Sequence, residues 1–407
     1  MSERPHIVGY AQPWSLRAGE RLEVMLSADA PLEARAALVR LGSGETAGEA
    51  GEELVSELET LRVSLQTTQR GSCILVRATE DPWQPGPFVA AAFCMPTRLG
   101  ERQALLAQAD GATRWWFGLD AQGRPLAEAG LIPSETTAAR VEEPLVEGAW
   151  YLVAAGFDPL RGITVAARPL SPGPSWRVAP TRALRPGTAV ASAPLGLPGL
   201  LAGTLAIAAA PNDDGWEDNF DGKLEAPCLV AGALDEDLIE MLTSDDVAAA
   251  RLVARWELGP RSDGPDASGA TSVPCRGSGA RDGELYNSPL AGVTSHSWDG
   301  SEIDFRLAPN QYAALHFHSD DLDDCAWEPS LSVELPTNLR SGVYAIRVQA
   351  KGRPDERVPF FVRPASAGSD LLVLIPTASY LAYANDHPVS DGDFSEATAG
   401  CTPVLYE

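Results

Sequence analysis

The stretch GAWYLVAAGFDPLRGITVAARPL, residues 148–170, decides the fold class of this chain. Two apolar runs flank the turn sequence DPLRG, an arrangement typical of a β-hairpin. A second hairpin is predicted at RWWFGLDAQGRPLAEAG, residues 114–130, where Asp120 opens the turn and Gly123 closes it. Repeated hairpins of this kind predict a mainly β protein.

Length and composition agree with that prediction. The chain has 407 residues, of which 44% are hydrophobic, and it contains 37 glycines and 33 prolines. At about 100–200 residues per domain, this length predicts two or three domains, each large enough to bury a core. The glycine and proline content suits short strands joined by turns better than a helical bundle.

The net charge of −25 argues against two classes of partner. Such a surface repels nucleic acid and anionic membranes, so neither is predicted to bind. The uncharged stretch 187–211 is long enough to cross a bilayer, but Pro194 and Pro198 would break a helix there. We interpret it as a loop followed by a buried strand.

Cysteine usage and the N-terminus predict a cytoplasmic location. The six cysteines are scattered and form no CxxC pair, which argues against a zinc ribbon or a small disulfide scaffold. The N-terminal sequence MSERPHIVGY has no apolar core of a secretory signal.

Alternating apolar and polar residues predict strands outside these hairpins. In RLEVMLSA, residues 21–28, Leu22, Val24 and Leu26 fall on one face. Further along, GVYAIRVQA and RVPFFVRP are separated by KGRPDE, which predicts another hairpin.

One helix stands out from this β pattern. It is predicted over LTSDDVAAARLVARWELG, residues 242–259, with Thr243 or Ser244 as its N-cap. The sequence after it, residues 261–284, is rich in Gly, Ser, Pro and Asp and is predicted to be a surface linker.

The order of these patterns predicts a discontinuous domain. We expect an Ig-like β-sandwich made of two separated halves, with a jelly roll inserted between them. Three consecutive β modules are the alternative. The predicted segments are residues 1–80 for the first half, 81–260 for the jelly roll, 261–284 for the linker, 285–365 for the second half and 366–407 for the start of an α/β domain.

The last of these segments carries the first candidate site, in SDLLVLIPTASYLAYANDHP at residues 369–388. Residues 371–375 are predicted to form a buried strand, and Tyr380 and Tyr383 follow shortly after it. Ligands of open α/β sheets bind at the carboxyl ends of the strands. The loop with these tyrosines is therefore predicted to be functional, and packing at a domain interface is the alternative.

A second group of candidates lies in LHFHSDDLDD, residues 315–324. His316 and His318 are two residues apart on a predicted strand and would face the same side. With Asp320 close by, the group is predicted to contribute to a pocket or to bind a divalent metal. Hydrogen bonding within the sheet is the alternative, and it is favoured because no third ligand stands at a spacing typical of metal sites.

Two other polar stretches receive structural interpretations. In SHSWDGSE, a buried Trp298 beside a local turn is predicted in preference to a catalytic His296. An acidic loop could line a calcium site, but solvated carboxylates are the favoured interpretation. Its members are Asp213, Asp214, Glu217, Asp218 and Asp221.

Three segments resemble a laminin-G/concanavalin-like jelly roll: FVAAAFCMPT, GAWYLVAAGFD and FDGKLEAPCLVAGALDEDLI. The resemblance implies that fold for residues 81–260. It implies no function, because such modules bind sugars, proteins or nothing.

Nearly the whole chain, from Ile7 to about Asn385, resembles the large (beta) subunit of the N,N-dimethylformamidase family. The segments that carry the resemblance are VGYAQPWSLRAGERLEVMLSA, VTSHSWDGSEIDFR, QYAALHFHSDDLDDCAWEPS, LRSGVYAIRV, VPFFVRP and PTASYLAYAND. The resemblance implies hydrolysis of small N-substituted formamides to formate and amine. It also implies a small (alpha) subunit as partner and a homo-oligomer of the complete protein.

The same resemblance implies a glutamine-amidotransferase-like α/β domain beginning near Leu371. In the family that domain holds a mononuclear ferric iron through two tyrosines and a glutamate. Tyr380 is the match for one tyrosine ligand, Tyr383 is the second choice, and Asn385 belongs to the same pocket loop. The other family ligands would lie beyond Glu407, and one tyrosine cannot hold iron alone. We therefore expect no amidase activity from these 407 residues unless another polypeptide completes the site.

The alternative function is a non-catalytic β-sandwich module for binding or assembly. Hydrolase and nucleotide-binding motifs of other kinds, including G-x-S-x-G, H-E-x-x-H and G-x-G-x-x-G, do not occur in the sequence.

Overall fold

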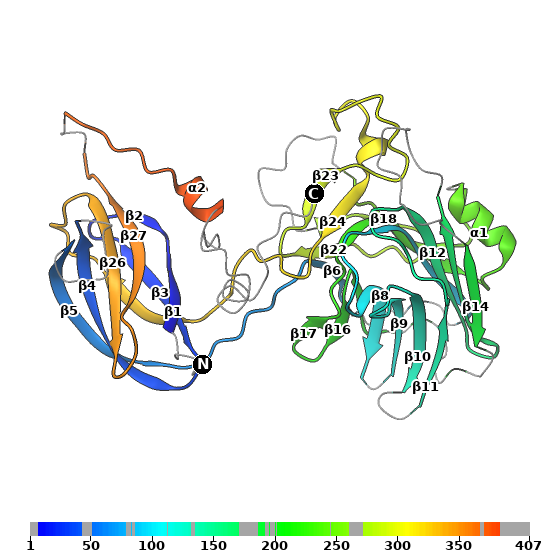
Figure 1. The fold of residues 1–407 in the computed structure, drawn as a ribbon, viewed down its shortest axis with the longest axis horizontal. Helices are drawn as coiled ribbons and strands as arrows, with labels where there is room; N and C mark the ends of the chain where they lie inside the picture. Colours follow the sequence, from blue (N-terminus) through cyan, green and yellow to red (C-terminus); the bar gives the residue numbers. More distant parts are fainter. Residues whose placement is uncertain are drawn as a thin grey trace. The chain divides into compact units, whose positions relative to one another are not determined.

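The computed structural model shows two compact units, each of which is described by itself. The structure describes residues 7–42, 51–78, 83, 86–111, 113–131, 135–170, 186–191, 195, 200, 202–244, 246–259, 272–366 and 370–382. The first unit contains the described residues up to Thr68 and those from Cys325 onward, and the second unit is Gln69–Asp324. Both units are mainly β, as predicted (Figure 1).

The first unit is a sandwich of two β-sheets. One sheet has the strand order β1-β3-β25 and the other has the order β2-β27-β26-β4-β5. The strands are β1 (Ile7–Gln12), β2 (Ser15–Arg17), β3 (Arg21–Ala28), β4 (Leu32–Leu41), β5 (Glu52–Val63), β25 (Pro329–Glu334), β26 (Gly342–Ala350) and β27 (Glu356–Arg363). Strands from both ends of the chain therefore share each sheet.

The core of the first unit forms where the apolar faces of these strands meet. Leu22, Val24 and Leu26 on β3 are fully buried at 0% exposure, which confirms the predicted alternation. The predicted hairpin at KGRPDE is also confirmed, since β26 and β27 are antiparallel and pair up to Val348 and Glu356.

The second unit is a larger sandwich. Its strands are β6 (Cys73–Val76), β7 (Phe88–Pro96), β8 (Gln103–Asp110), β9 (Thr113–Leu119), β10 (Pro125–Leu131), β11 (Glu135–Arg140), β12 (Tyr151–Asp158), β13 (Gly162–Pro169), β14 (Gly187–Ala191), β15 (Thr204–Ile207), β16 (Ala210–Asn212), β17 (Gly215–Glu217), β18 (Gly222–Ala231), β19 (Leu252–Trp256), β20 (Ser272–Val273), β21 (Cys275–Arg276), β22 (Gly283–Tyr286), β23 (Leu290–Val293) and β24 (Ala314–Phe317).

These strands form two main sheets that pack face to face. The eight-stranded sheet has the order β11-β10-β9-β8-β15-β6-β22-β20. The nine-stranded sheet has the order β14-β13-β12-β7-β18-β19-β21, with β24 beside β18 and β23 beside β24, and β16 pairs with β17 separately. Aromatic rings fill the space between the sheets: the ring centroid of Phe88 lies 5.0 Å from that of Phe157 and 5.2 Å from that of Trp115.

Both hairpins predicted in this unit are confirmed. Asp158 pairs with Gly162 across the turn between β12 and β13. Between β9 and β10, the amide of Gly123 donates to the carbonyl of Asp120 over 2.8 Å, and Gly123 has a φ of +74°, which glycine adopts readily.

The outer face of the nine-stranded sheet is covered by α1 (Glu236–Thr243). Leu238, Ile239 and Leu242 of this helix pack on apolar residues of the sheet, and Asp235 caps its first turn by accepting a hydrogen bond from the amide of Leu238.

The helix predicted over residues 242–259 is wrong. The structure places α1 earlier, so that Thr243 is its last residue and Ser244 its C-cap, and residues 252–256 form β19. Ala254 and Trp256 face the core, so the burial has the period of two that a strand requires. The Ser and Asp residues that suggested the start of a helix instead come after the C-terminal end of α1.

The observed boundaries of the units differ from the predicted segments. β22, β23 and β24 pair within the second unit, so the second part of the first unit begins at Cys325 and not at residue 285. β6 also belongs to the second unit because it lies between β15 and β22. Residues 261–271 of the predicted linker lie outside the described residues, and the rest of it contains β20, β21 and the start of β22.

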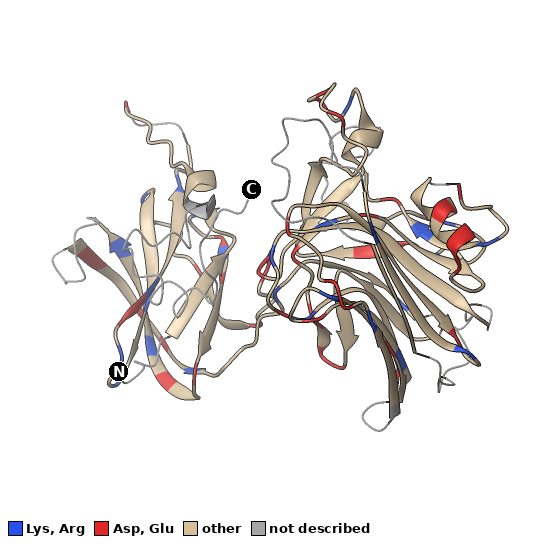
Figure 2. Ribbon diagram, turned by 45° about the vertical axis from the view of Figure 1, so that its right-hand side comes forward, with Lys and Arg blue, Asp and Glu red and all other residues tan. Residues whose placement is uncertain are grey.

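Acidic residues are scattered along the ribbon of both units, including α1 and several loops (Figure 2). No helix in the described part of the chain is long and apolar enough to cross a membrane.

Candidate functional site

The C-terminal segment that carries the tyrosines follows β27. The strand predicted for residues 371–375 is not formed among the described residues, because these residues pair with no other strand there. Leu371, Leu372 and Leu374 are 86–88% exposed. An extended segment without neighbouring strands leaves its backbone groups and side chains to water, whatever its apolar pattern. No α/β sheet occurs among the described residues.

The helix α2 (Thr377–Ala382) begins directly after this segment and contains Tyr380. The orientation of the Tyr380 side chain is not among the described features, and Tyr383 and Asn385 lie outside the described residues. The order of an apolar extended segment, a proline and a helix matches the beginning of a βα unit, but the sheet that would complete it is not part of the described structure.

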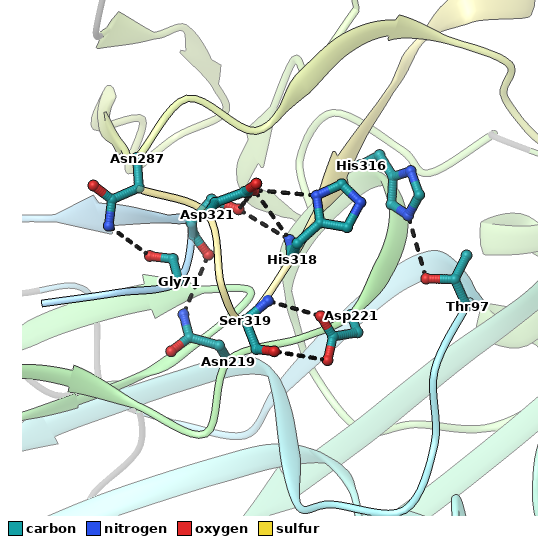
Figure 3. Close-up of polar contacts among 10 residues, drawn as sticks. Gly71, Thr97, Asn219, Asp221, Asn287, His316, His318, Ser319 and Asp321 are labelled. Carbon is teal, nitrogen blue, oxygen red and sulfur yellow. Dashed lines mark hydrogen bonds and ion pairs between the residues drawn. The ribbon is translucent and has the colours of Figure 1, made fainter. Parts of the chain in front are cut away.

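The histidine pair lies at the end of β24, in the second unit (Figure 3). His316 pairs with Lys223 on β18 and with Leu290 on β23. The ring centroids of His316 and His318 are 4.1 Å apart, so the predicted proximity of the two rings is confirmed.

His316 is buried at 5% exposure, and its Nε2 lies 3.2 Å from Oγ1 of Thr97. Burial, together with the charges of His318 and Lys223, lowers the pKa of His316 to about 3. The ring is therefore neutral near pH 7 and acts as a hydrogen-bonding group inside the sheet.

The pKa of His318 is shifted in the opposite direction to that of His316. Burial alone would lower its pKa, but the hydrogen bond to Asp321 and the carboxylates of Asp221 and Asp320 raise it overall. Its Nδ1 lies 3.2 Å from Oδ2 of Asp321, and Ser72 donates to the same oxygen over 2.6 Å. The Asp321 carboxylate therefore links the segment that follows β24 to the segment that precedes β6.

Asp221 completes this polar cluster. Ser319 donates to its carboxylate from the backbone amide over 2.7 Å and from the hydroxyl over 3.0 Å. Burial raises the pKa of Asp221. The donors and acceptors of the cluster are thus largely satisfied by one another, and the described ranges contain no group of three or more His, Cys, Asp or Glu able to hold a metal.

The acidic stretch after β15 is also engaged with the protein. Asp218 accepts hydrogen bonds from Nε of Arg102 over 2.9 Å and from Nε1 of Trp116 over 3.0 Å. The Arg102 guanidinium lies over the Trp116 ring at 3.7 Å from the centroid. Asp218 and Asp221 therefore point to different partners and do not converge.

A fourth constellation joins His296, which the sequence interpretation set aside, to Glu225, which it did not single out. Nδ1 of His296 lies 2.7 Å from Oε2 of Glu225, and the amide of His296 donates to the same oxygen over 3.0 Å. Glu225 is 7% exposed, on the strand that pairs with β7 and β24. Trp298, which was expected to be buried, is only half-buried.

The Glu225–His296 pair lines a cavity of about 1060 Å³ in the second unit. We call it the His296 cavity; among its other lining residues are Arg255, Trp256, Arg276 and Asn310. The two members of the pair are 71 positions apart, so no local motif joins them. The one signal in the sequence is a glutamate with a proline two positions later inside a mostly apolar strand, GKLEAPCLVA.

Comparison with known proteins agrees with the predicted resemblance. Residues 291–404 match the family described as N,N-dimethylformamidase beta subunit-like, C-terminal. The N,N-dimethylformamidase beta subunit of Paracoccus aminophilus is 33% identical over 422 residues, covering 98% of this chain and 55% of that protein. The subunit of the same name from Alcaligenes sp is 32% identical over 434 residues, with the same coverage of 98% and 55%. The chain thus spans about half the length of the curated relatives it matches.

Similar solved structures include the LG1-3 region of the laminin alpha2 chain, with 12% identity, a TM-score of 0.29 and coverage of 80% of this chain and 64% of that one. A heptameric SAP-like pentraxin from Limulus polyphemus has 13% identity, a TM-score of 0.28 and coverage of 42% and 82%. TM-scores this low do not identify a shared fold, and the jelly-roll assignment stays a prediction.

Proposed function

This chain belongs to the N,N-dimethylformamidase beta-subunit family over the part of that protein that it spans, and we propose that it provides the two β-sandwich units of an amide-hydrolysing subunit. The observation that carries the proposal is identity of 33% along 98% of this chain. The similarity includes both units and the segment with Tyr380, so it is not a match of one common module.

The proposed substrates are small N-substituted formamides. Hydrolysis joins the oxygen of water to the formyl carbon, breaks the C–N bond and transfers a proton to the amine nitrogen, so that formate and an amine are released. The family resemblance implies that the groups that perform these steps belong to the α/β domain that begins near Leu371.

Iron is the metal implied by the resemblance, and the described residues supply at most one of its proposed ligands, Tyr380. A phenolate oxygen suits ferric iron, but a mononuclear site needs several ligands in fixed geometry. These residues therefore do not form the iron site by themselves. Tyr380 is proposed as one ligand, with Tyr383 as the second choice.

In this proposal the apolar segment at residues 371–375 becomes the first strand of the α/β part of the enzyme. Its exposed leucines are unusual for a free surface, because large apolar side chains gathered in sequence are normally covered. An adjoining sheet would both pair the backbone and bury these side chains. A small (alpha) subunit, a homo-oligomer and a cytoplasmic location are further parts of the proposal that rest on the family resemblance and the sequence.

The second candidate function is a non-catalytic module for binding or assembly. It is favoured by one observation, namely that the described ranges contain no group of three or more His, Cys, Asp or Glu able to hold a metal. In that case the two sandwiches would act only by contacting other molecules.

The test is formate release from N,N-dimethylformamide by the protein purified from its natural source together with the subunits that accompany it. Tyr380→Phe should abolish formate release, and Tyr10→Phe, a half-buried tyrosine in the first unit, should leave it unchanged. Equal activity of the two variants would remove Tyr380 from the site. Absence of formate from the native protein would favour the binding module.

A further inference from the structure

The His296 cavity has the features of a binding site separate from the segment with Tyr380. It lies wholly within the second unit and is lined by residues of β18, β19, β20 and β21, by Asp282, and by the segments at residues 296–297 and 309–313. Its volume of about 1060 Å³ lies just above the range, about 300–1,000 Å³, that is usual for pockets of small organic ligands.

The imidazole of His296 is held in one orientation by three contacts. Glu225 binds Nδ1, the ring stacks on Phe93 with centroids 4.0 Å apart, and Trp150 meets it edge-on at 6.3 Å. In the neutral ring, a proton on Nδ1 is the one that the Glu225 carboxylate can accept in a hydrogen bond, and Nε2 is then the nitrogen available to accept from a ligand. An imidazole oriented by a buried carboxylate is the arrangement that proteins use to present Nε2 for binding or proton transfer.

The loop that carries His296 is itself tied down. The amide of Ser295 donates to the carbonyl of Gln311 over 2.9 Å, and the hydroxyls of Ser295 and Ser297 each donate to the carbonyl of Asn310 over 3.1 Å. The ring is therefore positioned by a braced loop and by the sheet beneath it.

The strand that supplies Glu225 is irregular at that point. The pairing of β18 with β7 shifts register between Glu225 and Cys228, and Ala226 adopts a φ of +49°. A residue other than glycine rarely occupies this left-handed region, and bulges of this kind redirect side chains beside functional sites. The irregular backbone lies at the wall of the cavity, where it sets the direction of the Glu225 carboxylate.

Two arginines, Arg255 and Arg276, also line the His296 cavity. Arg255 on β19 pairs directly with Arg276 on β21, so their side chains leave the same face of the sheet. Like charges at directly opposed positions repel each other. Arg276 lies 3.3 Å from Glu257, but both side chains are more than half exposed, and such a pair contributes little. Arg255 has further interactions within the chain.

We propose that the His296 cavity binds an organic anion, whose carboxylate or phosphate is taken by Arg255 and Arg276 and whose hydroxyl donates to Nε2 of His296. Guanidinium groups bind either oxyanion through charge-assisted hydrogen bonds. The volume favours an organic molecule over an inorganic ion. This site does not depend on amide hydrolysis, so its test and the formate assay can fail separately.

The test is calorimetric titration of the full chain with three probes. Gluconate carries a carboxylate and hydroxyls, hexanoate has the same carbon number and no hydroxyl, and glycerol 3-phosphate replaces the carboxylate by a phosphate ester. We expect saturable binding of gluconate or glycerol 3-phosphate, and the tighter of the two identifies the oxyanion. We expect hexanoate to bind more weakly than gluconate.

Three variants test which residues of the cavity contact the bound anion. Arg276→Gln, at an exposed position, should weaken binding at least about tenfold, the factor expected for one charge-assisted contact. Arg363→Gln, an exposed arginine of the first unit, is the matched control and should bind as the native chain does. His296→Phe keeps a ring to stack on Phe93 and should abolish the preference for gluconate over hexanoate.

The proposal is overturned if none of the probes gives a saturable signal with the native chain, or if Arg363→Gln weakens binding as much as Arg276→Gln. Because Arg276→Gln does not disturb the buried pair, the proposal stays testable even if His296→Phe fails to fold. If hexanoate equals gluconate in the native chain, the role of Nε2 is refuted.

Discussion

Replacing His316 by glutamine should make the second unit more resistant to acid. In the folded state burial and the charges of His318 and Lys223 lower the pKa of His316 from 6.5 to about 3. The folded protein therefore holds His316 neutral over a range of pH in which the unfolded chain binds a proton. Glutamine retains a polar amide near Thr97 and does not titrate.

The sign of the effect follows from this difference in proton binding. Above pH 6.5 both states leave His316 neutral, and its titration costs no stability. As the pH falls from 6.5 toward 3, the unfolded state gains a proton that the folded state does not accept, so stability is lost. At pH 4.5, which lies 2 units below the unfolded pKa, the loss amounts to about 3 kcal/mol at most.

The assay is urea unfolding at pH 7.5 and at pH 4.5, followed by tryptophan fluorescence. Trp115, Trp116 and Trp256 are fully buried in the second unit, so their emission reports its unfolding. Because the chain has two units, two transitions are fitted where the data require them. The quantity to compare is the free energy of unfolding of the variant minus that of the native chain at each pH, because the titration of carboxylates elsewhere is common to both and cancels.

His318→Gln is the matched control because its pKa is shifted in the opposite direction. The folded pKa of His318 is raised, so the stabilisation from its protonated form is present below 6.5 and is lost as the pH rises through the folded pKa. His318→Gln should therefore cost stability at pH 4.5 and less at high pH. If His316→Gln showed the same loss of stability from pH 7.5 to 4.5 as the native chain, the linkage described here would be refuted.

Three further predictions concern local structure and are measured by thermal unfolding. Gly71→Ala should destabilise the second unit by about 2 kcal/mol or more, because the φ of Gly71 is +87° and the added Cβ would lie 2.3 Å from Asn219. Gly352→Ala is the comparison: the φ of Gly352 is +78°, but no atom lies within 4 Å of the added Cβ, so the substitution should cost about 1 kcal/mol. Asp235→Ala should cost about 1 kcal/mol through loss of the α1 cap. Leu372→Ser, at 88% exposure, should change stability by less than about 0.5 kcal/mol in this chain.

Local patterns in the sequence were sufficient for much of the fold. Alternation along β3 and the turn residues at Asp120 and Gly123 are properties of a few adjacent residues, and the structure confirms them. The helix at residues 242–259 was misplaced because Ser and Asp after Thr243 can either start a helix or follow one. Only the packing of Leu238 and Leu242 on the sheet decides between these alternatives.

The candidate sites were less predictable for a physical reason. His316 and His318 were identified because two positions on one strand suffice to bring them together. Glu225 and His296 are joined only after β18, β24 and a distant loop have assembled, so spacing in the sequence carries no sign of them. The apolar run at residues 371–375 has the composition of a strand, but pairing needs a neighbouring strand that the described residues do not provide.

The central claim is that residues 371–375 are the first strand of the enzyme's α/β part, and amide hydrogen exchange of that segment tests it most directly. Measured on the isolated 407-residue chain, these amides should exchange rapidly, since they are unpaired and their side chains are exposed. Measured on the protein purified from its natural source, the same amides should be protected to the level of β26. Equally rapid exchange in both samples would contradict the account.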